Sequence, residues 1–326
     1  MRDNVLVVHG GGPTAVLNAS LYGVLLEARE SGAVGAVYGA IGGSEGILKE
    51  RFLNLSRFPE EELKKLLTTP GTAIGSSRYA LEEEDYKAME AIFRKHHIRY
   101  VLFNGGNGTM DACGKLVRAL GPDSDIRVAG IPKTIDNDLW GTDMTFGFQS
   151  AVNVATDAID CIHTTAASHG RVFIVEVMGH KVGWLTLHAG IAGGADIILI
   201  PEIPYDINVV VNALKERNRQ GKRFSILAVA EGAISKEDAS LTKKELKEKK
   251  KNGLVYPSVA YELGAKIEEL TGQEVRVTVP GHTQRGGEPC AYDRVLSTRL
   301  GAEAAGLILN KEYGYMVCVE NNEISK

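Results

Sequence analysis

The sequence predicts an α/β fold of two lobes, each with a mainly parallel sheet flanked by helices. Short apolar runs rich in β-branched residues recur along the chain, and amphipathic helical patterns separate several of them. This alternation is typical of parallel sheets that are covered by helices on both faces. At 326 residues, the chain is long enough for two such layered domains.

Each predicted element rests on its local pattern. The predicted strands are the apolar runs at residues 4–9, 98–103, 126–131, 172–177, 196–200, 224–230 and 315–319. A helix after the first run has apolar residues at helical spacing, namely Leu17, Leu21, Val24, Leu25 and Ala28. A later helix repeats this spacing at Ala151, Val154, Ala155, Ala158, Ile159 and Ile162.

Composition and charge exclude several classes of protein. A formal net charge of −4 gives no reason to expect nucleic-acid binding, and the basic run at residues 243–251 also contains glutamates, which indicates a solvated helix or loop. No apolar run approaches the ~20 residues of a membrane span and no targeting signal is visible, so we expect a cytoplasmic protein without a membrane partner. The four cysteines form no CxxC pair and lie in apolar patterns, which predicts reduced core thiols.

Glycine and charged residues gather just after the predicted strands. The clusters are His9-Gly10-Gly11-Gly12-Pro13, Gly105-Gly106-Asn107-Gly108-Thr109, Ile131-Pro132-Lys133-Thr134-Ile135-Asp136-Asn137-Asp138, Met178-Gly179-His180 and Glu231-Gly232. Because the carboxyl ends of parallel strands meet at one edge of a sheet, we expect these clusters to converge.

The stretch FNGGNGTMDACGKL, residues 103–116, joins a predicted strand to a predicted helix through a glycine-rich turn. Such a junction presents unpaired backbone N–H groups and the positive end of the helix dipole, an arrangement that favours phosphate. A tight turn that binds nothing is the alternative.

Two further groups of charged residues indicate chemistry. Asp136 and Asp138 beside Lys133 suit phosphoryl transfer, in which cations hold phosphates, a metal bridges them and a carboxylate takes a proton. A turn or a helix cap is the alternative for this DND sequence. His282 and Arg285 in GHTQRGGEPCAYDR, with Arg276 upstream, indicate a second phosphate or carboxylate site; surface ion pairing is the alternative for any one arginine, including Arg171 and Arg78.

Together these motifs resemble the phosphofructokinase family. GGNGT, PKTIDND, SHGRVFIVEVMGH and GHTQRGGEPCAYDR occur in the family's order, and GGGPTAVLNAS and PGTAIGSSR match its first glycine loop and its donor-side arginine segment. The likeness extends from Val5 to Val319. It implies an active site in the cleft between a donor-binding lobe, residues 1–147 plus about 260–310, and a sugar-phosphate lobe, residues 148–259 plus about 311–326.

The resemblance implies a role for each matching residue. Asp136 is the expected general base for the 1-hydroxyl of fructose 6-phosphate, with Lys133, Thr134 and Asp138 beside it. The expected substrate contacts also include Arg171, Met178, Gly179, His180, Glu231, Arg276, His282 and Arg285, and the expected donor contacts are Gly12, Arg78, Gly105, Gly106, Gly108 and Thr109. In the family, Arg171 and Arg276 reach across from a neighbouring subunit, so a homotetramer or homodimer with shared active sites is expected.

Two departures from the family pattern concern catalysis. Asn107 stands where an aspartate associated with Mg²⁺ is usual, and its amide oxygen offers the metal one negative charge less. His180 stands where an arginine is common, which replaces a full cation by a group charged only part of the time at neutral pH. A protein that binds sugar phosphates without turnover is therefore an alternative, although the presence of Asp136 favours an enzyme.

The phosphoryl donor and the acceptor each have an alternative. Gly108 leaves room for the α-phosphate of a nucleotide, which favours ATP, whereas Lys133 and the GGGPT opening resemble the branch of the family that uses pyrophosphate. We expect ATP on grounds of steric room. Fructose 6-phosphate is the expected acceptor, and sedoheptulose 7-phosphate is the alternative.

Overall fold

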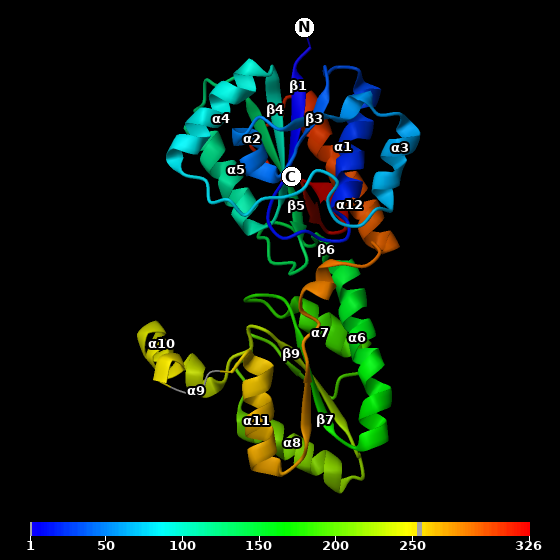
Figure 1. Ribbon diagram of the computed structural model, residues 1–326, viewed down its shortest axis with the longest axis vertical. Helices are drawn as coiled ribbons and strands as arrows, with labels where there is room; N and C mark the ends of the chain where they lie inside the picture. The colour runs from blue at the N-terminus through cyan, green and yellow to red at the C-terminus, as the bar shows by residue number, and fades with distance from the viewer. Residues whose placement is uncertain (1, 253–255) are drawn as a thin grey trace. The chain divides into compact units, whose positions relative to one another are not determined.

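The computed structural model describes residues 2–252 and 256–326, which fold into two compact units (Figure 1). Unit 1 comprises Met1–Ser150 and Arg285–Lys326, and unit 2 comprises Ala151–Gln284. Each unit contains a sheet of parallel strands with helices on its faces, which confirms the predicted fold class.

Unit 1 is built on a six-stranded sheet with the order β3-β2-β1-β4-β5-β6. Its strands are β1 (Asn4–His9), β2 (Val37–Ala40), β3 (Phe52–Asn54), β4 (Ile98–Gly105), β5 (Arg127–Thr134) and β6 (Phe146–Gly147). Neighbouring strands are parallel except β2 and β3, which are antiparallel. The carboxyl ends of β1, β4 and β5 therefore lie next to one another.

Helices cover both faces of this sheet. Val5 and Val7 of β1 pack with α1 (Leu17–Ser31) and α12 (Ala291–Leu309), whereas Leu6 and Val8 pack with α2 (Gly43–Leu48), α4 (Glu83–Lys95) and α5 (Asn107–Leu120). Short helical segments complete the unit, namely η1 (Leu55–Arg57), α3 (Glu60–Lys64) and η2 (Lys65–Leu67). The apolar face predicted for the first helix is confirmed, because all five of its residues are buried.

Unit 2 has a four-stranded parallel sheet with the order β10-β7-β9-β8. The strands are β7 (Val172–Val177), β8 (Ile197–Leu199), β9 (Ser225–Ala230) and β10 (Val275–Thr278). One face packs against α8 (Ile207–Arg219) and α11 (Val259–Thr271), and α7 (Trp184–Ala192) packs on the other face. The remaining elements are α6 (Phe148–His169), which starts in unit 1, α9 (Lys236–Ala239), α10 (Lys243–Asn252) and η3 (Gly281–Arg285).

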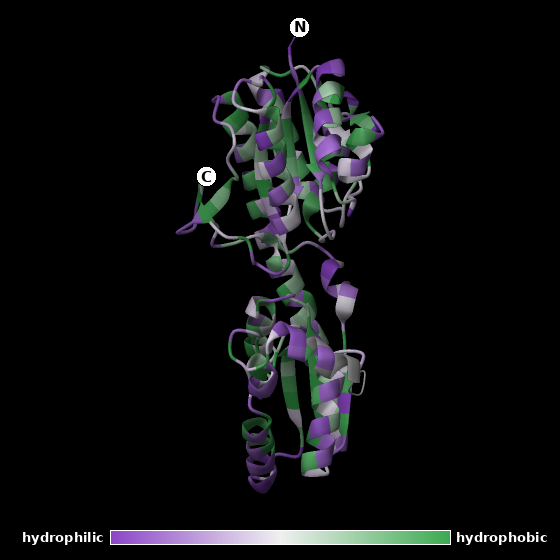
Figure 2. Cartoon of the chain, turned by 90° about the vertical axis from the view of Figure 1, so that its left-hand side faces the viewer, coloured by the Kyte–Doolittle hydropathy of each residue, from purple (hydrophilic) through white to green (hydrophobic). Residues whose placement is uncertain are grey.

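Hydropathy follows this layering. In Figure 2 the strands of both units are mainly hydrophobic in colour, and the helices carry hydrophilic stretches. The basic run forms α10, with Lys243 and Lys244 exposed, in agreement with a solvated helix. All four cysteines are free. Cys161 is exposed, so the prediction that the thiols lie in the core is wrong for this residue. Among the described residues, no helix has the length and apolar content needed to cross a bilayer.

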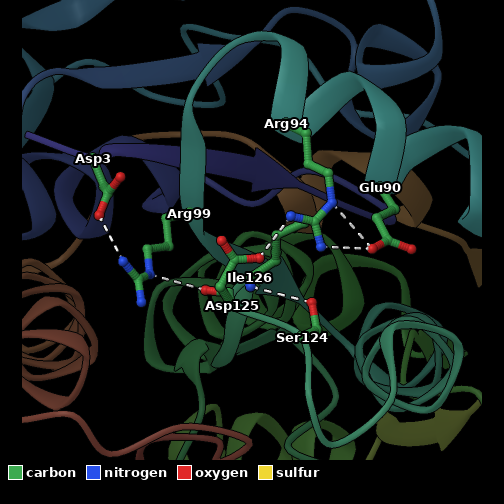
Figure 3. Close-up of polar contacts among 7 residues, drawn as sticks. All are labelled: Asp3, Glu90, Arg94, Arg99, Ser124, Asp125 and Ile126. Atoms are coloured by element: carbon green, nitrogen blue, oxygen red, sulfur yellow. Dashed lines mark hydrogen bonds and ion pairs between the residues drawn. The ribbon is translucent and has the colours of Figure 1, made fainter. Parts of the chain in front are cut away.

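Side-chain contacts hold the amino-terminal edge of the unit 1 sheet (Figure 3). Arg99, at the start of β4, donates to a carboxylate oxygen of Asp3 and to the carbonyl of Asp125, both at 3.0 Å. Arg94, near the end of α4, pairs with the carboxylates of Asp125 and Glu90, each at 2.9 Å. These ion pairs are exposed, so water screens them and each adds little to stability. The opposite edge of the sheet carries the glycine loops.

The predicted strands agree with most of the observed ones. Residues 4–9 and 172–177 match residue for residue, and the runs at 98–103 and 126–131 continue to Gly105 and Thr134. The strand predicted at residues 315–319 is wrong in its first part. Met316 forms only an isolated bridge to Gly130, and the strand proper, β11 (Cys318–Glu320), pairs antiparallel with β12 (Glu323–Ser325).

The compact units differ from the expected lobes at two places. Residues 260–284 lie in unit 2 rather than in the first lobe, because β10 pairs with β7 along its length. Residues 311–326 lie in unit 1 rather than in the second lobe. They stay there because Met316 bridges Gly130 and because the Val319 amide donates to the Thr142 hydroxyl at 3.0 Å.

Candidate active site

Three loops meet at the carboxyl edge of the unit 1 sheet. They follow the neighbouring strands β1, β4 and β5 and contain the glycines after His9, the turn at Gly106 and the segment from Ile135 to Asp138. Direct contacts join them, since Lys133 bonds to Gly12 and Asn107 bonds to Asp138. The clusters predicted from the sequence of this unit therefore do converge.

Thr109 sets the spacing of two of these loops. Its side chain is buried, and its hydroxyl and methyl groups are among the nearest atoms that a Cβ at Gly10 or Gly105 would meet. Both positions must lack a side chain for the loops to approach each other. Gly108, one residue before Thr109, is different, because a Cβ there would meet nothing within 4 Å. The first turn of α5 thus faces open space at Gly108.

Lys133 is the buried cation of the site. It lies near the end of β5 with only 3% of its surface exposed, and its Nζ donates to the Gly12 carbonyl at 2.6 Å. Burial, followed by the positive charge of Arg285, lowers the pKa of Lys133 from 10.5 to about 8. Asp136 and Asp138 act in the opposite direction and do not compensate.

Two arginines lie near this lysine. The guanidinium of Arg285 packs against Gly12, where a Cβ would come within 2.6 Å of Nη1. Arg78 is exposed, and its charge also lowers the pKa of Lys133. The segment before Arg78 is held to the first glycine loop by a bridge between Ser77 and Gly10 and by further bonds in the same stretch. Arg285, expected among the sugar-phosphate contacts, therefore has its described neighbours in unit 1.

His9 belongs to the first cluster seen in the sequence, but sequence reasoning assigned it no role. It is fully buried at the end of β1, and its Nδ1 lies 2.7 Å from the Thr72 hydroxyl. The Thr72 hydroxyl donates to the Gly75 carbonyl, so it accepts from His9 and Nδ1 carries the ring proton. Nε2 therefore presents a lone pair. This nitrogen has no hydrogen-bond partner among the described residues. Burial, with a smaller contribution from Lys133, lowers the pKa of His9 to about 3, so the ring is neutral.

The loop after β5 holds two half-buried carboxylates. Between Asp136 and Asp138, Asn137 adopts a left-handed backbone with φ of 53°, and its side-chain oxygen accepts from the Thr145 amide at 2.8 Å. The Asp136 amide donates to the Thr134 hydroxyl at 3.0 Å. These bonds fix the turn and therefore the positions from which the two carboxylates project.

The residues present fit a magnesium ion. The Asn107 amide donates to Asp138 Oδ2 at 2.7 Å, which brings its own side-chain oxygen into the same region as the carboxylate. Within the described part of the chain there is no cluster of three or more histidine, cysteine or acidic side chains that would form an all-protein cage. One or two carboxylates with phosphate and water ligands are the usual Mg²⁺ environment.

Unit 2 gathers a second set of predicted residues at the carboxyl edge of its sheet. Met178, Gly179 and His180 follow β7, and Glu231 follows its neighbour β9. Glu231 Oε1 accepts from the His180 amide at 2.6 Å and from the Gly179 amide at 3.3 Å. His180 has a left-handed backbone with φ of 53° and an exposed side chain. Glu231 thus orders the loop and presents His180 to solvent.

Gln284 is a second residue that sequence reasoning did not single out, although it lies inside the GHTQRGG motif. It is buried, its Oε1 accepts from the Met178 amide at 3.2 Å, and its Nε2 donates to the Gly281 carbonyl at 3.0 Å. Through these two bonds it ties η3, which contains His282, to the loop after β7.

Arg171 and Arg276 lie at the other end of the unit 2 sheet. Arg171 directly precedes β7, and Arg276 pairs in register with Phe173 near the start of that strand. Glu274 binds both arginines, with a distance of 2.5 Å to Arg171 Nε. The six residues of β7 separate this pair from Met178, a length of about 20 Å. The predicted cradle is thus divided within one chain.

The carboxyl edge of the unit 1 sheet combines glycine loops, a buried cation and two carboxylates. These are the parts of a phosphoryl-transfer protein. The chain belongs to the phosphofructokinase family, whose model, described as Phosphofructokinase, matches residues 4–308.

Known relatives agree with this assignment. An ATP-dependent 6-phosphofructokinase of Spirochaeta thermophila is 44% identical over 98% of this chain and 87% of its own length. An ATP-dependent 6-phosphofructokinase 3 of Bacteroides thetaiotaomicron is 39% identical over 100% and 90%. The crystal structure of a pyrophosphate-dependent phosphofructokinase from Nitrosospira multiformis is 26% identical, covers 99% of this chain and 82% of its own, and superposes with a TM-score of 0.87.

Proposed function

We propose that the chain is an ATP-dependent 6-phosphofructokinase, which transfers the terminal phosphoryl group of ATP to the 1-hydroxyl of fructose 6-phosphate and forms fructose 1,6-bisphosphate. The observation that carries the choice of donor is the open space beside Gly108 at the first turn of α5. A nucleotide needs room at this point for its α-phosphate, and the N-terminal amides of the helix favour anions. The relatives at 44% and 39% identity, both named ATP-dependent, support the same donor.

Pyrophosphate is the second candidate donor because Lys133 is buried against Gly12. A compact ammonium in this position suits a small, highly charged anion. The pyrophosphate-dependent phosphofructokinase from Nitrosospira multiformis is less similar, at 26% identity. ATP and pyrophosphate are therefore compared directly in the first assay.

In the proposed mechanism, the oxygen of the 1-hydroxyl attacks the terminal phosphorus of ATP while Asp136 accepts the hydroxyl proton. The bond between that phosphorus and the bridging oxygen breaks, and ADP leaves. Lys133 and Arg78 supply positive charge at the glycine loops, where negative charge collects on the phosphates. Asp138 and Asn107 would hold Mg²⁺, which when bound neutralises part of the donor's charge. The Asn137 turn keeps Asp136 in place, so little reorganisation is required at the moment of transfer.

For the sugar phosphate, we propose contacts from the carboxyl edge of unit 2, namely Met178, Gly179, His180, Glu231 and His282. Arg171 and Arg276 belong to the same cradle only if a second copy of the chain supplies them, because they lie at the opposite edge of the sheet. This separation supports a homodimer or homotetramer with shared sites. A cytoplasmic location stays a prediction from the sequence.

The test of the mechanism is Asp136→Asn. Loss of the general base should lower kcat by about 10²- to 10⁴-fold and leave binding of fructose 6-phosphate nearly unchanged. Asp123→Asn, at an exposed position before β5, is the matched control and should retain full activity. Product formation is measured with ATP and, separately, with pyrophosphate. Full activity of Asp136→Asn would remove the proposed mechanism.

A further inference from the structure

A surface pocket lies at the amino-terminal edge of the unit 1 sheet, the opposite edge from the glycine loops. It has a volume of about 460 Å³ and is formed by the end of α5, the start of β5 and the segment that follows α12. Most of its side chains are apolar, namely Val117, Leu120, Pro122, Ile126 and Val128. A pocket of this size and lining suits a small organic molecule.

Backbone hydrogen bonds hold the walls of the pocket in place. The Gly314 amide donates to the Val128 carbonyl at 2.9 Å, so the segment after α12 runs beside β5. At the end of α5, the Gly121 amide donates to the Val117 carbonyl at 3.2 Å. The side chains of Ile126 and Val128 belong to the buried core on this face of the sheet. The pocket is therefore formed before a ligand arrives, which lowers the entropic cost of binding.

Two arginines of the pocket have no anionic partner. Among the described residues, neither Arg118 nor Arg127 joins an ion pair or donates a side-chain hydrogen bond, and no acidic side chain lines the pocket. The Arg127 guanidinium instead lies 4.8 Å from the centre of the Tyr313 ring. Arg94 and Arg99, at the same edge of the sheet, each pair with an aspartate (Figure 3). The arginines that line the pocket are thus left available for a ligand.

The chemistry of the lining indicates the class of ligand. Apolar walls favour an alkyl or aromatic body, and guanidinium groups favour a carboxylate or sulfonate, which they bind through paired N–H donors. A guanidinium that stacks on an aromatic ring, as Arg127 does on Tyr313, keeps its N–H donors for an anion. A hydrated inorganic anion would leave the apolar walls unused.

We propose that this pocket is a binding site for a small amphipathic organic anion, such as a medium-chain carboxylate. It is separate from the proposed active site, because Arg127 and Thr134, at the two ends of β5, are about 23 Å apart. Neither the phosphoryl donor nor the sugar phosphate competes for it. The proposal is independent of the proposed function, since binding is measured without turnover.

Fluorescence titration of the full-length protein with anilinonaphthalene sulfonate tests the site, because this aromatic anion binds exposed apolar surface. We expect saturable binding that is unchanged by saturating MgATP and, in a separate titration, by saturating fructose 6-phosphate. Octanoate should displace the probe, whereas octylammonium, which has the same chain and the opposite charge, should not. Displacement by MgATP or by fructose 6-phosphate, equal displacement by octylammonium, or the absence of saturable binding would overturn the proposal.

Three arginine variants locate the probe. Arg118→Met and Arg127→Met should each weaken binding of the probe by about 5- to 10-fold, because methionine keeps an apolar stem and removes the charge. Arg94→Met removes the same charge at the same edge of the sheet but outside the pocket, and should bind the probe as the wild type does. If all three variants bind the probe equally well, the pocket is not its site and the proposal fails.

Val117→Glu gives a second test that does not depend on the arginines. Val117 is 40% exposed on α5, where glutamate is a good helix former, so the variant should fold. The new carboxylate should repel the probe and octanoate. Val117→Gln has nearly the same size without the charge and is the matched control, which should retain most of the binding. Equal binding of octanoate by Val117→Glu and Val117→Gln would contradict an anion site.

Discussion

The charge of Lys133 should set the alkaline limit of donor use. Its pKa of about 8 means that the ammonium is about nine-tenths protonated at pH 7 and about one-tenth protonated at pH 9. If the protonated form holds the donor phosphate, kcat/KM for ATP should fall about tenfold for each pH unit above 8. The ratio kcat/KM for ATP is the right quantity because it reports the form of the enzyme to which ATP binds.

Two substitutions separate Lys133 from other groups that titrate in this range. Lys133→Arg keeps a positive charge throughout, because a guanidinium has a pKa above about 12, and its profile should be flat between pH 8 and 9.5. Lys133→Met keeps the length and apolar stem of the side chain without the charge. Its kcat/KM for ATP should be low at every pH and should show no alkaline limb.

The assay is the initial rate of fructose 1,6-bisphosphate formation at saturating fructose 6-phosphate, with ATP varied from pH 7 to 9.5. This range lies above the ionisation of phosphate groups, near pH 6. The profile of kcat/KM for fructose 6-phosphate serves as the internal control and should lack the limb that belongs to Lys133. A wild-type profile that stays level through pH 8, or a limb that persists in Lys133→Arg, would refute the reasoning.

Two more predictions follow from the same edge of the sheet. His9 has a pKa near 3 when folded and an ordinary value of 6.5 when unfolded, so stability is complete above pH 6.5 and falls as the pH drops towards 3, by about 2 kcal/mol at pH 5. Chemical unfolding at pH 7 and pH 5 measures this loss, which His9→Gln should reduce; equal losses in both proteins would contradict it. Gly108→Asp should fold normally, because its Cβ enters open space, and should lower kcat/KM for ATP at least tenfold through repulsion of the α-phosphate while sparing pyrophosphate. Equal effects on both donors would show that Gly108 does not select the donor.

The sequence predicted the parts of the fold whose signal is local. The strands at residues 4–9 and 172–177 are mainly apolar runs that are buried on both faces, and such runs can be identified without tertiary information. β2 and β6 were missed because they are four and two residues long and contain glycine. The lobe boundaries were misplaced because strand pairing, such as that of β10 with β7, joins segments about 100 residues apart in the chain.

The site shows the same division between local and tertiary information. Glycine loops after strands are visible in the sequence, and the convergence of those after β1, β4 and β5 follows from the parallel order. The positions of Arg285 and Gln284 are not visible in this way, because each of them contacts a residue more than 100 positions away in the chain, Gly12 and Met178 respectively. The signal that was available for His9 is its place at the end of the run VLVVH, where an otherwise apolar strand ends in an imidazole.

The neutral state of His9 explains how the cations at Gly12 can coexist. A protonated imidazole near Lys133 would add another buried positive charge, and burial prevents this by lowering the pKa of His9 to about 3. The remaining ring proton bonds to Thr72 and so attaches the segment that leads to Arg78 to the end of β1. Because His9 is neutral, the positive charge here belongs to side chains that can face a phosphate, such as Lys133 and Arg78. The bond from His9 to Thr72 also holds the segment that contains Arg78. The positive charge at this edge is consequently available to the ligand.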